Sequence, residues 1–407
     1  MRWVWLRRRW VWIGVWGIVI LHVGRVPARG DRQCIPIPEV ITDPNEGTTV
    51  GILGVILMSD DEAKSVSSII APDVRYNDSF GVWPTFRYFG YPDPKTHFTI
   101  IAGKATKQGE DAEAEYSGHD MFEGWLDALG RAQHEEDPFE RFYGFGNNTP
   151  SQNETNFAST TNGGRIFGGL NFHGPWQVSL AARLSEERIG RGAVTSLPQL
   201  RDPSSGFSTV NGADGATTVG TRFGLTYDSR DRPDIPTEGI FATAGVEPVD
   251  KALGASSSYV RYGLESKGFI PLRSDKRLIV ALHGALDYIQ NGDQAPFFEL
   301  NSIGGIHSLR GFGSHRFTDN NRFVFQGELR SNVYEREIFG VVAHLEVAPF
   351  IDMGQVFQSS REVPVDDLHF VGGCGFRAVV VPQVVAFVDV GTNGGSPAAF
   401  TGIDYPF

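Results

Sequence analysis

The sequence has little cysteine, no long apolar run after its first residues and no excess of basic side chains. Its two cysteines, Cys34 and Cys374, stand far apart in the chain and make no disulfide framework. The formal net charge of −12 argues against a nucleic-acid partner, because nucleic-acid phosphates are bound by basic surfaces. After residue 28, no apolar stretch reaches the roughly 20 residues that a membrane-spanning helix needs.

Signatures of catalytic and metal sites are also missing. The sequence has no Gly-x-Ser-x-Gly elbow and no phosphate-binding loop. The spacing of His119, Asp120 and Glu123 suits no tight metal geometry. His307 and Ser308 are adjacent, which does not by itself create a catalytic pair. We therefore expect no enzymatic activity, no metal ion and no cofactor.

The first 28 residues have the composition of a secretory signal peptide. Three arginines at 7–9 precede an apolar core at 11–21, and Val26, Pro27 and Ala28 form a small-residue cleavage site. A retained membrane anchor is the alternative, which the shortness of the apolar run disfavours. Residues 29–47 include a proline-rich piece at 35–38 and are expected to be a short irregular segment.

From residue 48 onward, short segments of β type alternate with turn residues, and the 49 glycines and 29 phenylalanines fit many tight turns and interfacial rings. In one segment Arg261, Glu265 and Lys267 share a phase, with apolar residues between them, so that one face is polar and the other apolar. The strand candidates are 48–58, 80–91, 96–107, 112–125, 156–172, 176–189, 217–228, 239–247, 257–270, 277–289, 296–302, 321–334, 341–357, 368–380, 384–391 and 398–407.

The most informative run is 304–313, in which glycines surround Arg310. Glycine permits backbone geometries that other residues resist, and arginine carries a fixed planar charge. In the strand candidates that follow, Glu328 and Asp352 lie in the polar phase and point to the same side of the sheet. An arginine carried into that space by a loop would therefore meet two carboxylates.

Leu309, Arg310, Gly311 and Phe312 resemble the signature loop of the BamA/TamA surface-antigen family of bacterial outer-membrane barrels. Three further stretches are similar to family motifs: 350–357 to the Asp-x-Gly strand, and also 227–239 and 142–147. The resemblance covers 147–407 well and the earlier strands weakly. It implies that Glu328 and Asp352 hold Arg310 inside the barrel. Members usually carry globular periplasmic domains ahead of the barrel, which this sequence is expected to lack.

The last residues also resemble a feature of outer-membrane barrels, their C-terminal assembly signal, with Gly402, Tyr405 and a final Phe407. We therefore expect an all-β fold: a single closed antiparallel transmembrane barrel of about 16 strands. Closure is required because lipid offers no partner for an open strand edge. The expected divisions are a signal peptide at 1–28, a short periplasmic segment at 29–47 and the barrel at 48–407, with the loop 305–320 folded inward.

The function implied by the resemblance is insertion or translocation of polypeptides at the bacterial outer membrane, in contact with its lipid. The first and last strands would meet at a lateral seam, weakened by Gly51, Gly54, Gly402 and Pro406, and an incoming strand would pair there. The expected partners are unfolded outer-membrane or secreted polypeptides and a separate protein that supplies periplasmic domains. The alternative is a passive pore or structural barrel without assembly activity.

Overall fold

The computed structural model describes residues 32–60, 65–172, 174–338, 341–359, 361, 365–380, 384–403 and 405–407. The expected signal peptide, residues 1–28, lies outside the described residues. Most of the described chain forms one antiparallel sheet of 19 strands, and a separate sheet has two strands. The prediction of an all-β antiparallel fold is therefore confirmed. In the part of the chain described, no helix is long and apolar enough to span a bilayer.

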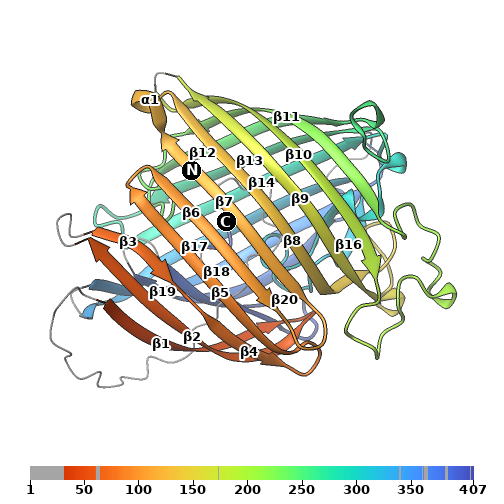
Figure 1. Ribbon diagram of the computed structural model, residues 1–407, viewed down its shortest axis with the longest axis horizontal. Coiled ribbons are helices and arrows are strands. Elements are labelled where there is room, and N and C mark those ends of the chain that lie inside the picture. The colour runs from red at the N-terminus through yellow and green to blue at the C-terminus, as the bar shows by residue number, and fades with distance from the viewer. Residues whose placement is uncertain are drawn as a thin grey trace.

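The strands of the large sheet pair in chain order, and the sheet curls around a central space (Figure 1). A short helix, α1 (Met121–Gly124), joins two of them. The strands are β1 (Arg32–Asp43), β2 (Gly47–Asp60), β3 (Ser65–Ile70), β4 (Asp73–Asn77), β5 (Gly81–Asp93), β6 (Thr96–Lys104), β7 (Glu110–Asp120), β8 (Leu126–Phe142), β9 (Thr155–Asn171), β10 (Trp176–Gly190), β11 (Ala216–Asp228), β12 (Gly239–Val249), β13 (Tyr259–Pro271), β14 (Leu278–Gln290), β17 (Asn321–Ile338), β18 (Val341–Phe357), β19 (His369–Val380), β20 (Val384–Thr392) and β21 (Ala398–Ile403).

The number of strands exceeds the expected number. β3 and β4 both pair with β2 and β5 and are two parts of one crossing, interrupted at Ala71 and Pro72. When β3 and β4 are counted as one, the number of crossings is one fewer than the 19 strands and is even. The expected number was about 16. The expectation missed β1, the β3–β4 crossing and β8. β8 is rich in charge and reads as a loop, but charge is compatible with a strand whose inner face is polar.

The two faces of the sheet differ in polarity. Inward-facing side chains include buried charges such as Glu265, His283 and Asp287. Apolar side chains on the opposite face are exposed, among them Phe98, Ile100, Leu180, Leu225, Leu264, Ile351 and Phe370. A water-soluble protein buries its large apolar surfaces, so this outward apolar belt around a polar interior is typical of a sheet that lies in lipid.

The proposed periplasmic segment 29–47 is wrong over most of its length. Residues 32–43 form β1, which pairs with β2 without a register break. Pro36 and Pro38 fit there because β1 is an end strand of the sheet, and proline is tolerated where its missing N–H faces away from the ladder. Among the described residues the first strand begins at Arg32, and residues 48–58 belong to the second strand.

The connection between β14 and β17, residues 291–320, enters the central space. It contains the two-stranded sheet, β15 (Asn301–Ile303) and β16 (Phe317–Asp319), and its tip lies between them. The expected strand at 296–302 is instead a 3-10 turn at Phe297–Glu299 followed by β15. At the tip, Gly304 has φ +116° and a Cβ there would lie 2.3 Å from the Gly313 carbonyl oxygen, so only glycine fits.

Candidate functional site

The tip of the inner loop places Arg310 in a closed charged environment. Its side chain has no exposed surface. Asp352 on β18 accepts from Nε at 2.9 Å and from Nη2 at 2.7 Å, and it also accepts from the backbone N–H of Arg310 at 3.0 Å. This bidentate pair fixes both the position and the plane of the guanidinium. The guanidinium also lies 3.5 Å from the centre of the Phe350 ring.

Glu328 on β17 is shared by three arginines. Nη1 of Arg310 donates to it at 2.5 Å, Nε of Arg330 at 2.9 Å and Nη2 of Arg377 at 2.6 Å. Arg310 also donates to Asp389 on β20 at 2.8 Å. We call the seven side chains that share these contacts the loop-arginine cluster: Arg310, Glu328, Arg330, Glu346, Asp352, Arg377 and Asp389. It ties the loop to β17, β18, β19 and β20.

Apolar packing brings the loop to this position. Leu309, which precedes the arginine, is fully buried in a cluster with Ile303, Phe317 and Phe350. On the other side of the arginine, a Cβ at Gly311 would lie 2.9 Å from Val371, and a Cβ at Gly391 would lie 2.5 Å from the carbonyl oxygen of Arg310. Glycine at these two places lets the loop backbone approach β19 and β20 closely.

The electrostatics of the cluster keep the arginine charged. Burial lowers the pKa of the Arg310 guanidinium, but the carboxylates around it, Asp352 foremost, raise that pKa by more, so it lies above its ordinary value. Three guanidiniums face four carboxylates, and each of the seven charged groups has at least one ion-pair partner in the cluster. In a low-dielectric interior, removal of one partner would leave the others uncompensated.

The structure brings together all three residues that the sequence placed in one cluster, Arg310, Glu328 and Asp352. Sequence reasoning missed the other four members. A signal for Asp389 was present, because it is an isolated acidic residue in the apolar run Val384–Thr392 and shares one face of the strand with Phe387 and Gly391. Arg377 occupies the corresponding inward phase of β19.

The residues expected to weaken the seam do not all lie at the ends of the sheet. Gly51 and Gly54 are on β2, between β1 and β4 or β3, so their assignment to the first strand is wrong. Gly51 makes room inside the sheet, since a Cβ there would lie 2.9 Å from Glu39 and from Arg75. Gly402 is on β21, opposite Phe387, and Pro406 follows the end of that strand.

The C-terminal residues Tyr405, Pro406 and Phe407 do not continue the last strand to its expected end at Phe407. β21 ends at Ile403, and the three residues are buried against the inner wall. Phe407 packs with Phe269 and Ile279. A proline cannot donate to a ladder, which is a physical reason for the strand to stop before Pro406.

The other matched motifs make hydrogen bonds within or between connections of the sheet. Asn147 accepts from the N–H of Val356 at 3.0 Å and donates to the carbonyl of Asp367 at 2.6 Å. In the turn between β11 and β12, Arg230 donates to both carboxylate oxygens of Asp228, at 2.9 and 2.7 Å. These contacts fix the positions of connections at the ends of the strands.

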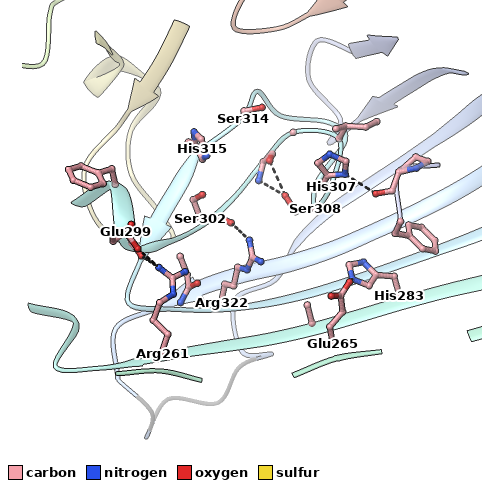
Figure 2. A pocket seen from close by; sticks show the side chains of 18 of the residues that line it. Arg261, Glu265, His283, Glu299, Ser302, His307, Ser308, Ser314, His315 and Arg322 are labelled. Atoms are coloured by element: carbon pink, nitrogen blue, oxygen red, sulfur yellow. Dashed lines mark hydrogen bonds and ion pairs between the residues drawn. The ribbon is translucent and has the colours of Figure 1, made fainter. Parts of the chain in front are cut away.

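Next to the loop lies a cavity of about 420 Å³. Figure 2 shows Arg261 extended to Glu299, and Arg322 turned toward the carbonyl of Ser302, with donor–acceptor distances of 2.9 and 3.0 Å. His283 and Glu265 lie on the same wall, 3.0 Å apart. Charged side chains therefore line part of the cavity, and those shown in Figure 2 are hydrogen-bonded to neighbouring groups.

Comparisons with known proteins agree with this architecture. BamA from Haemophilus ducreyi, in a crystal structure lacking POTRA domains 1–3, matches over 92% of this chain and 75% of that chain, at 15% identity and a TM-score of 0.56. CdiB from Escherichia coli matches over 93% of this chain and 62% of that chain, at 12% identity and a TM-score of 0.45. The first of these shows a shared fold. The sequence pattern of the Omp85 superfamily domain matches residues 108–377, and the chain belongs to the Omp85 superfamily.

Proposed function

We propose that this chain acts at the bacterial outer membrane, where it helps polypeptides insert into or cross the bilayer through a seam between β1 and β21. Membership of the Omp85 superfamily and the apolar outer face support that location. The observation that carries the proposal is the way the two end strands meet.

Between β1 and β21, hydrogen bonds of the Thr401 side chain take the place of a backbone ladder. Oγ1 of Thr401 on β21 accepts from the N–H of Thr42 at 3.1 Å and donates to the carbonyl of Val40 at 3.3 Å. Every other pair of neighbouring strands in the sheet is joined by a ladder, but the described residues of β1 and β21 are not. Their contact is therefore the weakest link around the sheet.

The sequence of β1 reduces the number of backbone donors on the edge that points away from β2. Thr42 and Val40 direct their backbone groups toward β21, and alternate residues of a strand share that direction. Pro36 and Pro38 lie in the same phase and have no N–H to donate. The edge of β1 that points away from β2 therefore lacks two donors, and it opens at lower cost than a full ladder, in which each group left unpaired in lipid costs several kcal/mol.

An opened seam would expose the backbone edges of β1 and β21. A client polypeptide in extended form could pair with one edge by β-augmentation. Under this proposal the clients are unfolded outer-membrane or secreted polypeptides, and a separate protein supplies periplasmic domains. The loop-arginine cluster, which holds the neighbouring strands β17 to β20, keeps the rest of the wall rigid while the seam moves.

The test is a reversible lock. In a chain with Cys34→Ser and Cys374→Ser, cysteines replace Thr42 and Thr401, which face each other across the seam. Oxidation should abolish client insertion and reduction should restore it. The control lock joins Leu264→Cys to Leu286→Cys, which are opposite each other on β13 and β14, and it should leave activity intact. Full activity in the oxidised seam variant would contradict lateral opening between β1 and β21.

A passive pore is the second candidate, and the polar cavity of about 420 Å³ is the observation that favours it. Ion conductance of the purified protein in planar bilayers, measured with the seam locked and unlocked, separates the two functions. A pore conducts in both states, and its depletion leaves the assembly of other barrels unchanged.

A further inference from the structure

Three arginines stand side by side on the inner wall, on neighbouring strands. Arg131 on β8 is directly opposite Arg165 on β9, and Arg165 is directly opposite Arg183 on β10. Figure 1 shows these three strands next to one another in the wall. All three arginines line the 420 Å³ cavity, and their side chains are 11%, 14% and 17% exposed. Like charges directly opposite each other destabilise a sheet, so this arginine row needs negative charge close by.

One end of the row shows how that charge is supplied. Glu299, from the inner connection 291–320, accepts from Nη1 and Nη2 of Arg183 at 3.0 and 2.9 Å. Glu247 on β12 accepts from Nε of the same arginine at 2.5 Å. The two bonds to Glu299 have the bidentate geometry in which a guanidinium holds an oxyanion. Arg183 is therefore satisfied by carboxylates of the chain itself.

The middle of the row has no equivalent carboxylate. In the described part of the chain, the one ion pair of Arg165 joins it to Glu115 at 3.7 Å, which is longer than a charge-assisted hydrogen bond of about 2.7–2.9 Å. Arg131 bonds to Glu113 through Nη2. Nε of Arg131 and Nε of Arg165 have no hydrogen-bond partner among the described residues. The positive charge of the row is therefore least compensated at Arg165.

Acidic side chains elsewhere on the cavity do not change this balance. Four of those that line it are paired with cations other than Arg165: Glu140 with His315, Glu247 and Glu299 with Arg183, and Glu265 with Lys267. Their charge is used at those places. An oxyanion from outside the chain would therefore be drawn to the centre of the arginine row.

The neighbouring inward positions of the same strands leave room for such an anion. Gln133 on β8 and Ser185 on β10 are both opposite Gly163 on β9, and all three residues line the cavity. Gly163 has no side chain, and a Cβ there would lie 2.7 Å from the carbonyl oxygen of Leu184, so the place between Gln133 and Ser185 stays open. The amide and the hydroxyl are hydrogen-bond donors on either side of this gap. An anion bound to Arg165 would meet them next.

The spacing of the row indicates the class of anion. Adjacent strands are about 4.8 Å apart, so the three arginines present charges at short, regular intervals. Acidic side chains on one face of an extended peptide repeat at about 7 Å, which is too wide for this row. Linked phosphate groups carry their charges closer together, and the planar fork of arginine matches phosphate oxygens.

We propose that the inner wall at β8–β10 carries a binding site for a small free anion with two or more linked phosphate groups. Arg131 and Arg165 hold the phosphate oxygens, Arg183 closes one end of the row, and Gln133 and Ser185 donate from the side. The site faces the interior, whereas Ile166, the next residue of β9, is 68% exposed on the outer face. The proposal depends on the site and holds for a pore as well as for an assembly factor.

The test is isothermal titration of the purified full-length chain, folded in a zwitterionic detergent, with inorganic tripolyphosphate. Binding should be saturable, with a Kd on the order of 1–100 μM at about 0.1 M salt. Orthophosphate, which can reach one guanidinium pair at a time, should bind at least about tenfold more weakly. The absence of saturable tripolyphosphate binding, or equal affinity for the two anions, would overturn the proposal.

A matched pair of variants tests the place of binding. Arg165→Gln removes the centre of the row and should weaken tripolyphosphate binding at least about tenfold, as expected for hydrogen bonds to a charged group. Arg188→Gln makes the same change in net charge on β10, but its side chain is 68% exposed and pairs with Glu186, so this chain should bind like the native chain. Equal weakening by the two substitutions would mean that overall charge, and not the arginine row, attracts the anion.

Two further measurements keep the test decisive. If Arg165→Gln does not fold, Arg165→Lys takes its place, and it should weaken binding severalfold because lysine keeps the charge without the planar fork. A hexaglutamate peptide should bind the native chain more weakly than tripolyphosphate, and tighter binding of the peptide would assign the site to acidic polypeptides instead. Affinity should be equal in phosphatidylcholine and phosphatidylglycerol nanodiscs, and a loss in the second would show that lipid headgroups reach the arginines.

Discussion

Two groups of buried charge line the same interior, and they are built differently. In the loop-arginine cluster every side chain has an ion pair, and Glu328 alone serves three arginines. The second group, which we call the seam-side cluster, consists of Glu39, Asp73, Arg75 and Arg87 on β1, β4 and β5. There Asp73 pairs with Arg87 at 2.5 Å and with Arg75 at 3.3 Å, but neither carboxylate oxygen of Glu39 has a hydrogen-bond partner among the described residues.

The difference shows that burial and charge do not by themselves make a stabilising site. Glu39 is 1% exposed and Glu328 is 3% exposed, so the two lose similar contact with water. A buried carboxylate is stabilising only where donors replace that water. The inner loop brings one such donor, Arg310, to Glu328, whereas no donor in the described part of the chain is hydrogen-bonded to Glu39. The part of the wall that the loop reaches is therefore the part where we expect buried charge to stabilise the fold.

The largest expected effect comes from removing the loop's charge. Arg310→Ala leaves Glu328, Asp352 and Asp389 short of a cation and should lower the free energy of unfolding by about 3–5 kcal/mol. The loop should then leave the interior, so protease access at 308–315 should rise in a barrel that still forms. Urea titration in detergent and limited proteolysis measure the two effects. The exchange Arg310→Glu with Asp352→Arg should restore part of the protection, and equal proteolysis in all three chains would refute the cluster's role.

A smaller loss is expected when charge is kept and geometry is lost. Arg310→Lys retains a cation but cannot make the two parallel bonds to Asp352 while also reaching Glu328. We expect a loss of about 2–3 kcal/mol, from hydrogen bonds to charged groups. The control is Lys267→Arg on β13, outside the loop-arginine cluster, which should change stability by less. A lysine variant as stable as the native chain would show that charge alone holds the loop.

The seam-side cluster has one member whose removal should matter. Asp73→Asn removes the carboxylate that Arg87 and Arg75 share, and we expect a loss of about 2 kcal/mol. The cost is smaller than for Arg310 because Arg75 keeps its hydrogen bond to Thr85 at 3.0 Å and the nearby charge of Glu39. Urea titration of Asp73→Asn beside Arg310→Ala measures the ranking. If Asp73→Asn lowers the free energy of unfolding as much as Arg310→Ala or more, the predicted ranking of the two clusters is wrong.

The sequence allowed much of this architecture to be predicted, for identifiable reasons. Period-two alternation placed Glu328 and Asp352 on the inner face, and the glycines around Arg310 indicated a loop in a narrow space. β1 was missed because Pro36 and Pro38 disfavour a strand everywhere except at an edge, and an edge is a property of the assembled sheet. The inward turn of Tyr405–Phe407 was missed for a similar reason, since its partners lie on strands far away in the sequence.

The smallest effect is expected for Glu39→Gln, and Glu328→Gln is its matched comparison because the same chemical change is made in both clusters. Glu328→Gln removes a charge that Arg310, Arg330 and Arg377 all contact, and it should destabilise the chain by about 3 kcal/mol or more. Glu39→Gln removes a charge that has no hydrogen-bond donor, so the loss of attraction to Arg75 and Arg87 is offset by the relief of burying an unsatisfied carboxylate. We expect a change of at most about 1 kcal/mol, in either direction. The two glutamines have the same shape as the residues they replace, so packing is constant and the difference between the two urea titrations measures how the charge is satisfied. Equal destabilisation by the two substitutions would mean that the charge of Glu39 stabilises the fold as much as that of Glu328. The two clusters would then not differ in how their buried charge is satisfied.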